Sequence, residues 1–250
     1  MKMKKILPII CAVALVAAMT YAAVLLDNRE IIFPEIAAIA VGVLVSPQFS
    51  WNANKLRIFI YITVCAILGV AIVKWLPLPV WAQMITAFLL AQILLANSKT
   101  SFAPMISALV LPVMLQTDTV VYFRFVAAPP LLVAFTEFSN PASKARIVPV
   151  KSVALITLCG LFGAALRWFF CIKLIIMPLY VTAVMTIICV ILLMKAMKLY
   201  IPPAGAVSIL AMLIPESSVT WFPLQIFIGA SFIMLISVLF FKEKKNASET

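Results

Sequence analysis

Two short segments of the chain combine a lysine, a proline-led helix start and small residues, and this combination can bind an anion. In the later segment, Pro202 and Pro203 end one apolar run and begin another that is only about 12 residues long. Free N–H groups at a helix start and the positive end of the helix dipole favour anions, and a nearby lysine adds a full charge. The expected solute site consists of Lys99, Ser101, Ala103, Pro104 and Ser107 in the earlier segment and Lys198, Pro202, Pro203, Ala204, Gly205 and Ser208 in the later one.

Two carboxylates stand in or beside apolar runs and are candidates for binding a coupling proton or cation. Glu137 lies one turn before a turn that contains Asn140, and it could instead pair with Lys198 or Lys99 or lie at the inner membrane surface. Glu35 follows Pro34, where a carboxylate can also complement the N-terminus of a helix. We expect Glu137, Asn140 and Glu35 to form the coupling group.

The sequence contains no recognisable catalytic motif. Histidine is absent, and the five cysteines lie in apolar runs without a CxxC pair, so neither a metal centre nor a disulfide framework is predicted. No glycine-rich nucleotide-binding loop and no nucleophile with a visible base is present. The sequence therefore predicts no catalytic residues, no cofactor and no ATP-driven transport by this chain alone.

The composition identifies the class of protein that must position these residues. Of the 250 residues, 66% are hydrophobic and 11% are charged, and the mean hydropathy is +1.21. A soluble domain is about half apolar and about a quarter charged. The long apolar runs predict an all-α polytopic membrane protein whose first partner is the lipid bilayer. The formal net charge of +11 is then explained by basic residues that flank membrane spans, and no nucleic-acid partner is predicted.

Hydropathy predicts ten membrane spans, several of them short. They cover residues 5–26, 31–47, 57–76, 79–97, 101–116, 121–138, 151–170, 174–197, 202–216 and 219–241. With the N-terminus inside, fourteen of the 19 Lys and Arg residues lie on the inner side. This bias predicts a cytoplasmic (inner or plasma) membrane location with both termini cytoplasmic. Segments 101–116 and 202–216 could re-enter instead of crossing, but re-entry would weaken the charge bias. As a separate alternative to an anion site, the lysines could be anchors at the inner membrane surface and the prolines ordinary kinks.

The order of the less common residues predicts an internal duplication. Pro79, Lys99 and Pro104 recur 99 residues later, and Pro47, Cys65 and Trp75 recur after 93 or 94 residues. A unit of four spans returns the chain to its starting side, so the two repeats would be parallel, with a site between them. The expected parts are a signal-anchor helix (1–26, uncleaved or cleaved near Ala22), repeats 27–117 and 118–218, a final span 219–241 and a basic tail 242–250.

The motif Pro-Pro-Ala-Gly-Ala at 202–206, with Pro215-Glu216 and Trp221-Phe222, resembles the signature of the HPP family of integral membrane proteins. Phe138 and Pro141 with the basic stretch from Arg146 to Lys151 are similar to a second motif of that family. Ile201 replaces the histidine that gives the family its name. The resemblance implies transport of a small anion such as nitrite. The first half is also somewhat similar to FUSC-type repeats of aromatic-acid exporters.

These observations lead to a functional prediction with two alternatives. The chain is expected to be a secondary transporter or channel for a small solute, either a nitrite-like anion or a small carboxylate, bound between the two repeats. One alternative is a FUSC-like exporter of aromatic acids. The other is a membrane scaffold or assembly protein that transports nothing. The short helices would also allow neighbouring copies to cover them in a homo-oligomer.

Overall fold

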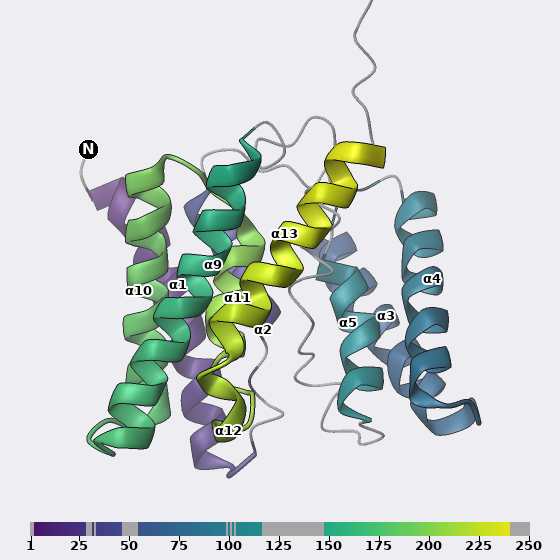
Figure 1. Cartoon of the computed structure of the whole chain (residues 1–250), viewed down its shortest axis with the longest axis horizontal. Helices are drawn as coiled ribbons and strands as arrows, with labels where there is room; N and C mark the ends of the chain where they lie inside the picture. The colour runs from purple at the N-terminus through teal and green to yellow at the C-terminus, as the bar shows by residue number, and fades with distance from the viewer. Residues whose placement is uncertain are drawn as a thin grey trace, which may run out of the picture.

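The computed structural model describes residues 3–28, 32, 34–46, 55–98, 100, 102, 104–116 and 148–240. These residues form helices and connecting turns, without a strand among them (Figure 1). The elements are α1 (Met3–Leu25), α2 (Pro34–Ala40), the π-helix η2 (Val41–Val45), α3 (Lys55–Trp75), α4 (Val80–Ser98), α5 (Pro104–Leu115), α9 (Pro149–Leu166), the π-helix η3 (Arg167–Lys173), α10 (Leu179–Met197), α11 (Pro202–Leu210), α12 (Glu216–Val219) and α13 (Phe222–Phe240).

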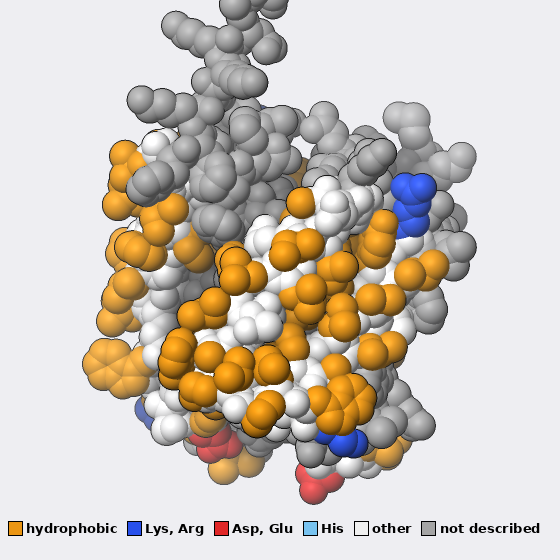
Figure 2. Space-filling view, turned by 90° about the vertical axis from the view of Figure 1, so that its right-hand side faces the viewer, with side chains coloured by type: hydrophobic (Ala, Val, Ile, Leu, Met, Phe, Trp, Pro, Cys, Tyr) orange, Lys and Arg blue, Asp and Glu red, His pale blue; other side chains and the backbone are white. Residues whose placement is uncertain are grey.

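Five of the described helical segments are long and apolar enough to cross a bilayer. They are Ile6–Leu25, Val80–Ser98, Pro149–Lys173, Leu179–Met197 and Phe222–Leu239. A helix needs about 20 apolar residues to cross about 30 Å of hydrocarbon. Hydrophobic side chains cover the middle of the face that α4 contributes to, and charged side chains lie near its upper and lower edges (Figure 2). The chain is therefore an all-α, multi-pass membrane protein.

Three short helices begin at prolines and lie inside the molecule. The segments that begin at Pro34 (α2 continued by η2), Pro104 (α5) and Pro202 (α11) are each twelve residues long or shorter. At 1.5 Å per residue, the longest reaches about 18 Å and cannot cross the hydrocarbon alone. Residues 104–113 and 202–209 are all buried. Protein therefore surrounds these broken helices, as the lack of water in a bilayer requires.

The short helices α2 and α11 occupy the centre of the molecule (Figure 1). On one side of them stand α1, α9 and α10, and on the other side stand α3, α4 and α5. α11 packs against α2, α9 and α10, whereas α2 packs against α1, α11 and α5. α13 packs along α9, and its last turn lies at the same end of the molecule as the N-terminus. α2 thus contacts both groups of helices.

Two glycines allow the short helices to approach their neighbours closely. A Cβ atom on Gly163 of α9 would overlap the backbone carbonyl oxygen of Ser208 in α11. A Cβ atom on Gly69 of α3 would overlap the carbonyl oxygen of Leu109 in α5. Small residues at such crossings let helix backbones pack together in a membrane, where the hydrophobic effect does not drive helices together. Both short helices are therefore held by a glycine on a longer partner.

Candidate functional site

The candidate site is the junction at which α2 meets α5 and α11, and we call it the three-helix junction. It is built by Pro34 and Glu35 in the first turn of α2, by Ser107 in the first turn of α5, and by Gly205 in α11 where that helix packs on Ala37. Each helix begins at a proline. Proline has no backbone N–H, and an N–H in the first turn would have no partner within the helix. The junction brings together residues that are far apart in the sequence.

Glu35 is completely buried, with 0% of its surface exposed. The hydroxyl of Ser107 faces its carboxyl group, but that hydroxyl donates its hydrogen to the carbonyl oxygen of Pro104 at 2.9 Å. Neither carboxylate oxygen of Glu35 accepts a hydrogen bond from a described residue. A buried polar group normally has such a partner, and a buried charge without one costs several kcal/mol. Both oxygens of this carboxyl group are therefore buried without a donor among the described residues.

Gly205 determines how closely α11 approaches α2. A Cβ atom at this position would lie 3.1 Å from the carbonyl oxygen of Ala37 and 3.2 Å from a methyl group of Val41. Both separations are tighter than ordinary van der Waals contact, so a larger residue would push α11 away from α2. Ser208, one turn later, donates its hydroxyl to the carbonyl of Gly205 at 2.7 Å and is satisfied within its own helix.

The start of α11 does not supply the cluster of free N–H groups that the sequence led us to expect. Pro202 and Pro203 have no N–H, and the N–H of Ala204 donates to the carbonyl of Ile201 at 3.0 Å. At the start of α5, Pro104 likewise has no N–H. The N–H of Met105 donates to Phe102 at 3.3 Å. The first-turn donors of α11 are therefore missing or already used, and an anion site at this helix stays a prediction that its amides do not support.

The other predicted site residues differ in where they lie. Lys198 is exposed and ends α10 in the left-handed conformation, with φ of 53°. Pro202, Pro203 and Ala204 are buried in the first turn of α11. The remaining predicted residues, Lys99, Ser101, Ala103, Glu137 and Asn140, lie outside the described residues, as does the predicted span 121–138. The junction thus contains Glu35, Ser107 and Gly205 from the predicted set. Pro104 is buried at the start of α5, and the exposed Lys198 side chain does not belong to the junction.

A cavity of about 270 Å³ opens beside the start of α5. Tyr61 and Cys65 of α3, Asn97 and Ser98 of α4, and Met105 of α5 contribute to its lining. The amide of Asn97 donates to the carbonyl of Ile93 at 3.0 Å, and Ser98 donates to Leu95 at 2.7 Å. The lining of this cavity thus combines polar and apolar residues, and the cavity lies next to the earlier of the two segments singled out in the sequence.

Arg167 is a buried residue whose role the sequence interpretation missed. It is one of the five Lys and Arg residues that the predicted topology places on the outer side, yet it is 2% exposed. Its Nη1 donates to the carbonyl oxygens of Ala211 at 2.5 Å and Ile214 at 2.6 Å, just beyond the last turn of α11. A cation at the C-terminal end of a helix complements the dipole and the unpaired carbonyls. An arginine inside an apolar run was the signal that could have identified it.

Comparison of the chain with known protein families, with curated proteins and with solved structures gave no match.

Proposed function

We propose that this protein is a secondary transporter for a small solute, coupled to a proton that Glu35 binds. The observation that carries the proposal is the complete burial of a carboxyl group without a hydrogen bond, at the meeting point of three broken helices. Ionisable groups inside a membrane protein are costly, and they mark ion pathways and proton relays. Broken helices near a repeat interface are where secondary transporters bind substrate and coupling ions.

The proposed mechanism uses two packing states of the junction. In the packed state described above, Glu35 carries a proton, because the neutral carboxyl avoids the cost of an unpaired buried charge. Its O–H then faces the hydroxyl oxygen of Ser107, which can accept a hydrogen bond. Separation of α2 from α11 would admit water to the carboxyl and release the proton. Solute would enter from the cavity beside α5. Because α2 contacts both α5 and α11, its movement would link solute entry to proton release.

We further propose that the chain is an internal duplication with ten spans, its two halves parallel. The two glycine contacts support this proposal. Gly69 and Gly163 are 94 residues apart, and the carbonyl-bearing partners Leu109 and Ser208 are 99 residues apart. These separations equal the offsets found in the sequence for the same two parts of the repeat. A cytoplasmic membrane location with both termini inside belongs to the same proposal and is supported by the lysine and arginine bias.

A nitrite-sized anion or a small carboxylate is the proposed substrate class. The resemblance of residues 202–206 to the HPP signature supports it, as do the lysines near both broken helices. Co-transport with a proton would also neutralise such an anion on its way through a region of low dielectric constant. The amides of α11 do not contribute to this argument, since they are already bonded.

The test is proton-driven uptake by the purified full-length protein in proteoliposomes. Wild type is expected to accumulate labelled nitrite or acetate when an inward proton gradient is imposed. Glu35→Gln, which keeps the shape of the protonated side chain, is expected to lose accumulation at least tenfold while solute exchange across the membrane continues. The matched control is Glu216→Gln, because Glu216 also follows a proline but is exposed.

Two outcomes would overturn the proposal. Accumulation by Glu35→Gln equal to that of wild type would remove Glu35 from coupling. Absence of flux for every small anion and aromatic acid in folded wild-type protein would favour the scaffold alternative.

A further inference from the structure

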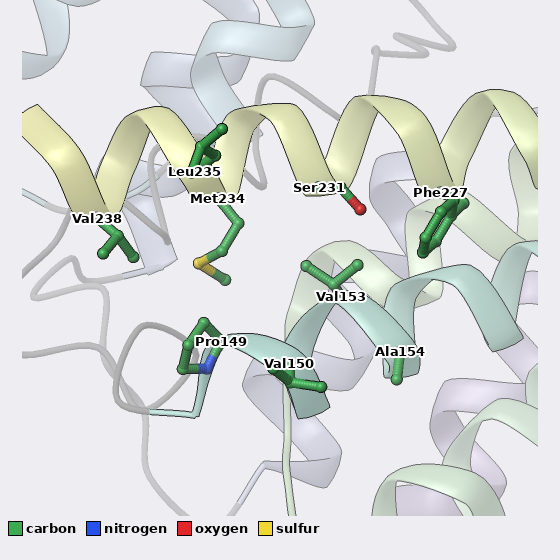
Figure 3. A pocket seen from close by; sticks show the side chains of 9 residues that line it. All are labelled: Pro149, Val150, Val153, Ala154, Phe227, Ser231, Met234, Leu235 and Val238. Carbon is green, nitrogen blue, oxygen red and sulfur yellow. The ribbon is translucent and has the colours of Figure 1, made fainter.

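A groove runs along the outside of the molecule between α9 and α13 (Figure 3). Its volume is about 440 Å³. Pro149 and Val153 line it from α9, and Phe227, Ser231, Met234 and Val238 line it from α13. Ser231 is the one polar side chain among the lining residues, and it points toward α9 (Figure 3). Both helices belong to the membrane-crossing set, so the groove is open to hydrocarbon.

We propose that this groove binds one acyl chain of an anionic phospholipid, whose headgroup lies at the first turn of α9. The length of the groove fits this occupant. From Phe227 to Val238 it follows eleven residues of α13, or roughly 16 Å at 1.5 Å per residue. That distance is about half of a hydrocarbon core of about 30 Å, which is the depth of one leaflet. The lining is apolar apart from Ser231, and it therefore matches an acyl chain.

The charges at one end of the groove specify an anionic headgroup. Lys151 is exposed in the first turn of α9, between the lining residues Val150 and Val153. The sequence adds Lys242, Lys244 and Lys245, with one glutamate among them, within five residues of the end of α13. Each lysine near a membrane surface attracts anionic lipid by about 1 kcal/mol. The start of α9 and the end of α13 lie at the same end of the molecule (Figure 1), so the exposed Lys151 lies at the end of the groove that Pro149 and Val238 line.

The test is native mass spectrometry of the full-length protein, purified from membranes and exchanged into mild detergent with added phosphatidylglycerol or phosphatidylcholine. Wild type is expected to retain one phosphatidylglycerol per chain. Val153→Trp and Val238→Trp each fill part of the groove and are expected to lower this retention at least tenfold. Lys151→Gln is expected to lower it about fivefold for phosphatidylglycerol, the factor that corresponds to about 1 kcal/mol, without a change for phosphatidylcholine.

The matched controls are one tryptophan substitution and one lysine-to-glutamine substitution on helices that do not line the groove. Ile85→Trp adds the same bulk to an exposed position on α4, and Lys195→Gln removes an exposed charge from the end of α10. Both are expected to retain lipid like wild type. Equal lipid retention by wild type and by both groove variants, with the thermal stability of all proteins unchanged, would overturn the proposal. So would a wild-type dimer that both tryptophan variants abolish without loss of lipid, because a second copy would then be the occupant.

Discussion

Replacement of Gly163 by alanine tests the closest approach of a broken helix to its partner. The new methyl group would overlap the carbonyl oxygen of Ser208 and would lie 3.0 Å from the carbonyl carbon and 3.1 Å from the Cβ of Ala211. The nearest of these atoms belong to backbone, which cannot rotate away as a side chain can. α9 and α11 would therefore have to separate by roughly 1 Å, a distance that forces neighbouring core side chains out of their packing.

The free-energy cost of this overlap follows from a comparison with Gly160→Ala, one turn earlier on the same helix. There the new methyl group would meet side-chain atoms only, the nearest being a methyl of Val207 at 3.2 Å. Both changes gain the same intrinsic helix preference of alanine over glycine, about 1 kcal/mol. Their difference therefore isolates the overlap, which costs about 1–3 kcal/mol. For a chain of this size, each 1 kcal/mol shifts the unfolding midpoint by about 2–4 °C.

Thermal unfolding of the purified protein in detergent, followed by tryptophan fluorescence, measures this difference. We expect the midpoint of Gly163→Ala to lie about 5 °C below that of Gly160→Ala. Gly69→Ala is expected to behave like Gly163→Ala, because its methyl group would overlap the carbonyl of Leu109. Equal midpoints for Gly163→Ala and Gly160→Ala would refute the close backbone approach. A loss at Gly163 without a loss at Gly69 would count against the equivalence of the two halves.

Three further changes probe the junction and its surroundings. Arg167→Met removes the donor from two carbonyls beyond α11, and each unpaired carbonyl in the interior costs about 1–3 kcal/mol of stability. We therefore expect a lower unfolding midpoint than for wild type. An unchanged midpoint would contradict the capping role. Lys198→Gly relieves the left-handed strain at φ of 53° and should stabilise the protein by about 1 kcal/mol; if solute flux falls despite this gain, Lys198 contributes to the transport path. Gly205→Ala should slow proton-driven uptake with little change in the unfolding midpoint, because the new methyl group would push α11 away from Ala37. Equal uptake by variant and wild type would show that this contact has no role in transport.

Much of the architecture follows from local properties of the sequence. Runs of apolar residues predict membrane helices because their length and composition alone decide whether they are stable in hydrocarbon. Pro34, Pro104 and Pro202 each begin a helix because a proline ring fixes the backbone angle and removes an N–H wherever it stands. The same local rule could have predicted that α11 lacks free amides, since Pro202 and Pro203 carry no N–H at all.

The environment of each charged residue was decided by packing. Pro34-Glu35 and Pro215-Glu216 are the same dipeptide, and each opens a short helix. Glu35 is completely buried, whereas Glu216 is exposed. Arg167 is likewise buried against the end of α11, although its sequence position suggested only a surface charge. Burial depends on which helices lie beside a residue, and α2, α5 and α11 are brought together across gaps of many residues. The local sequence around each glutamate does not determine which helices pack beside it, so only the tertiary structure distinguishes the two carboxylates.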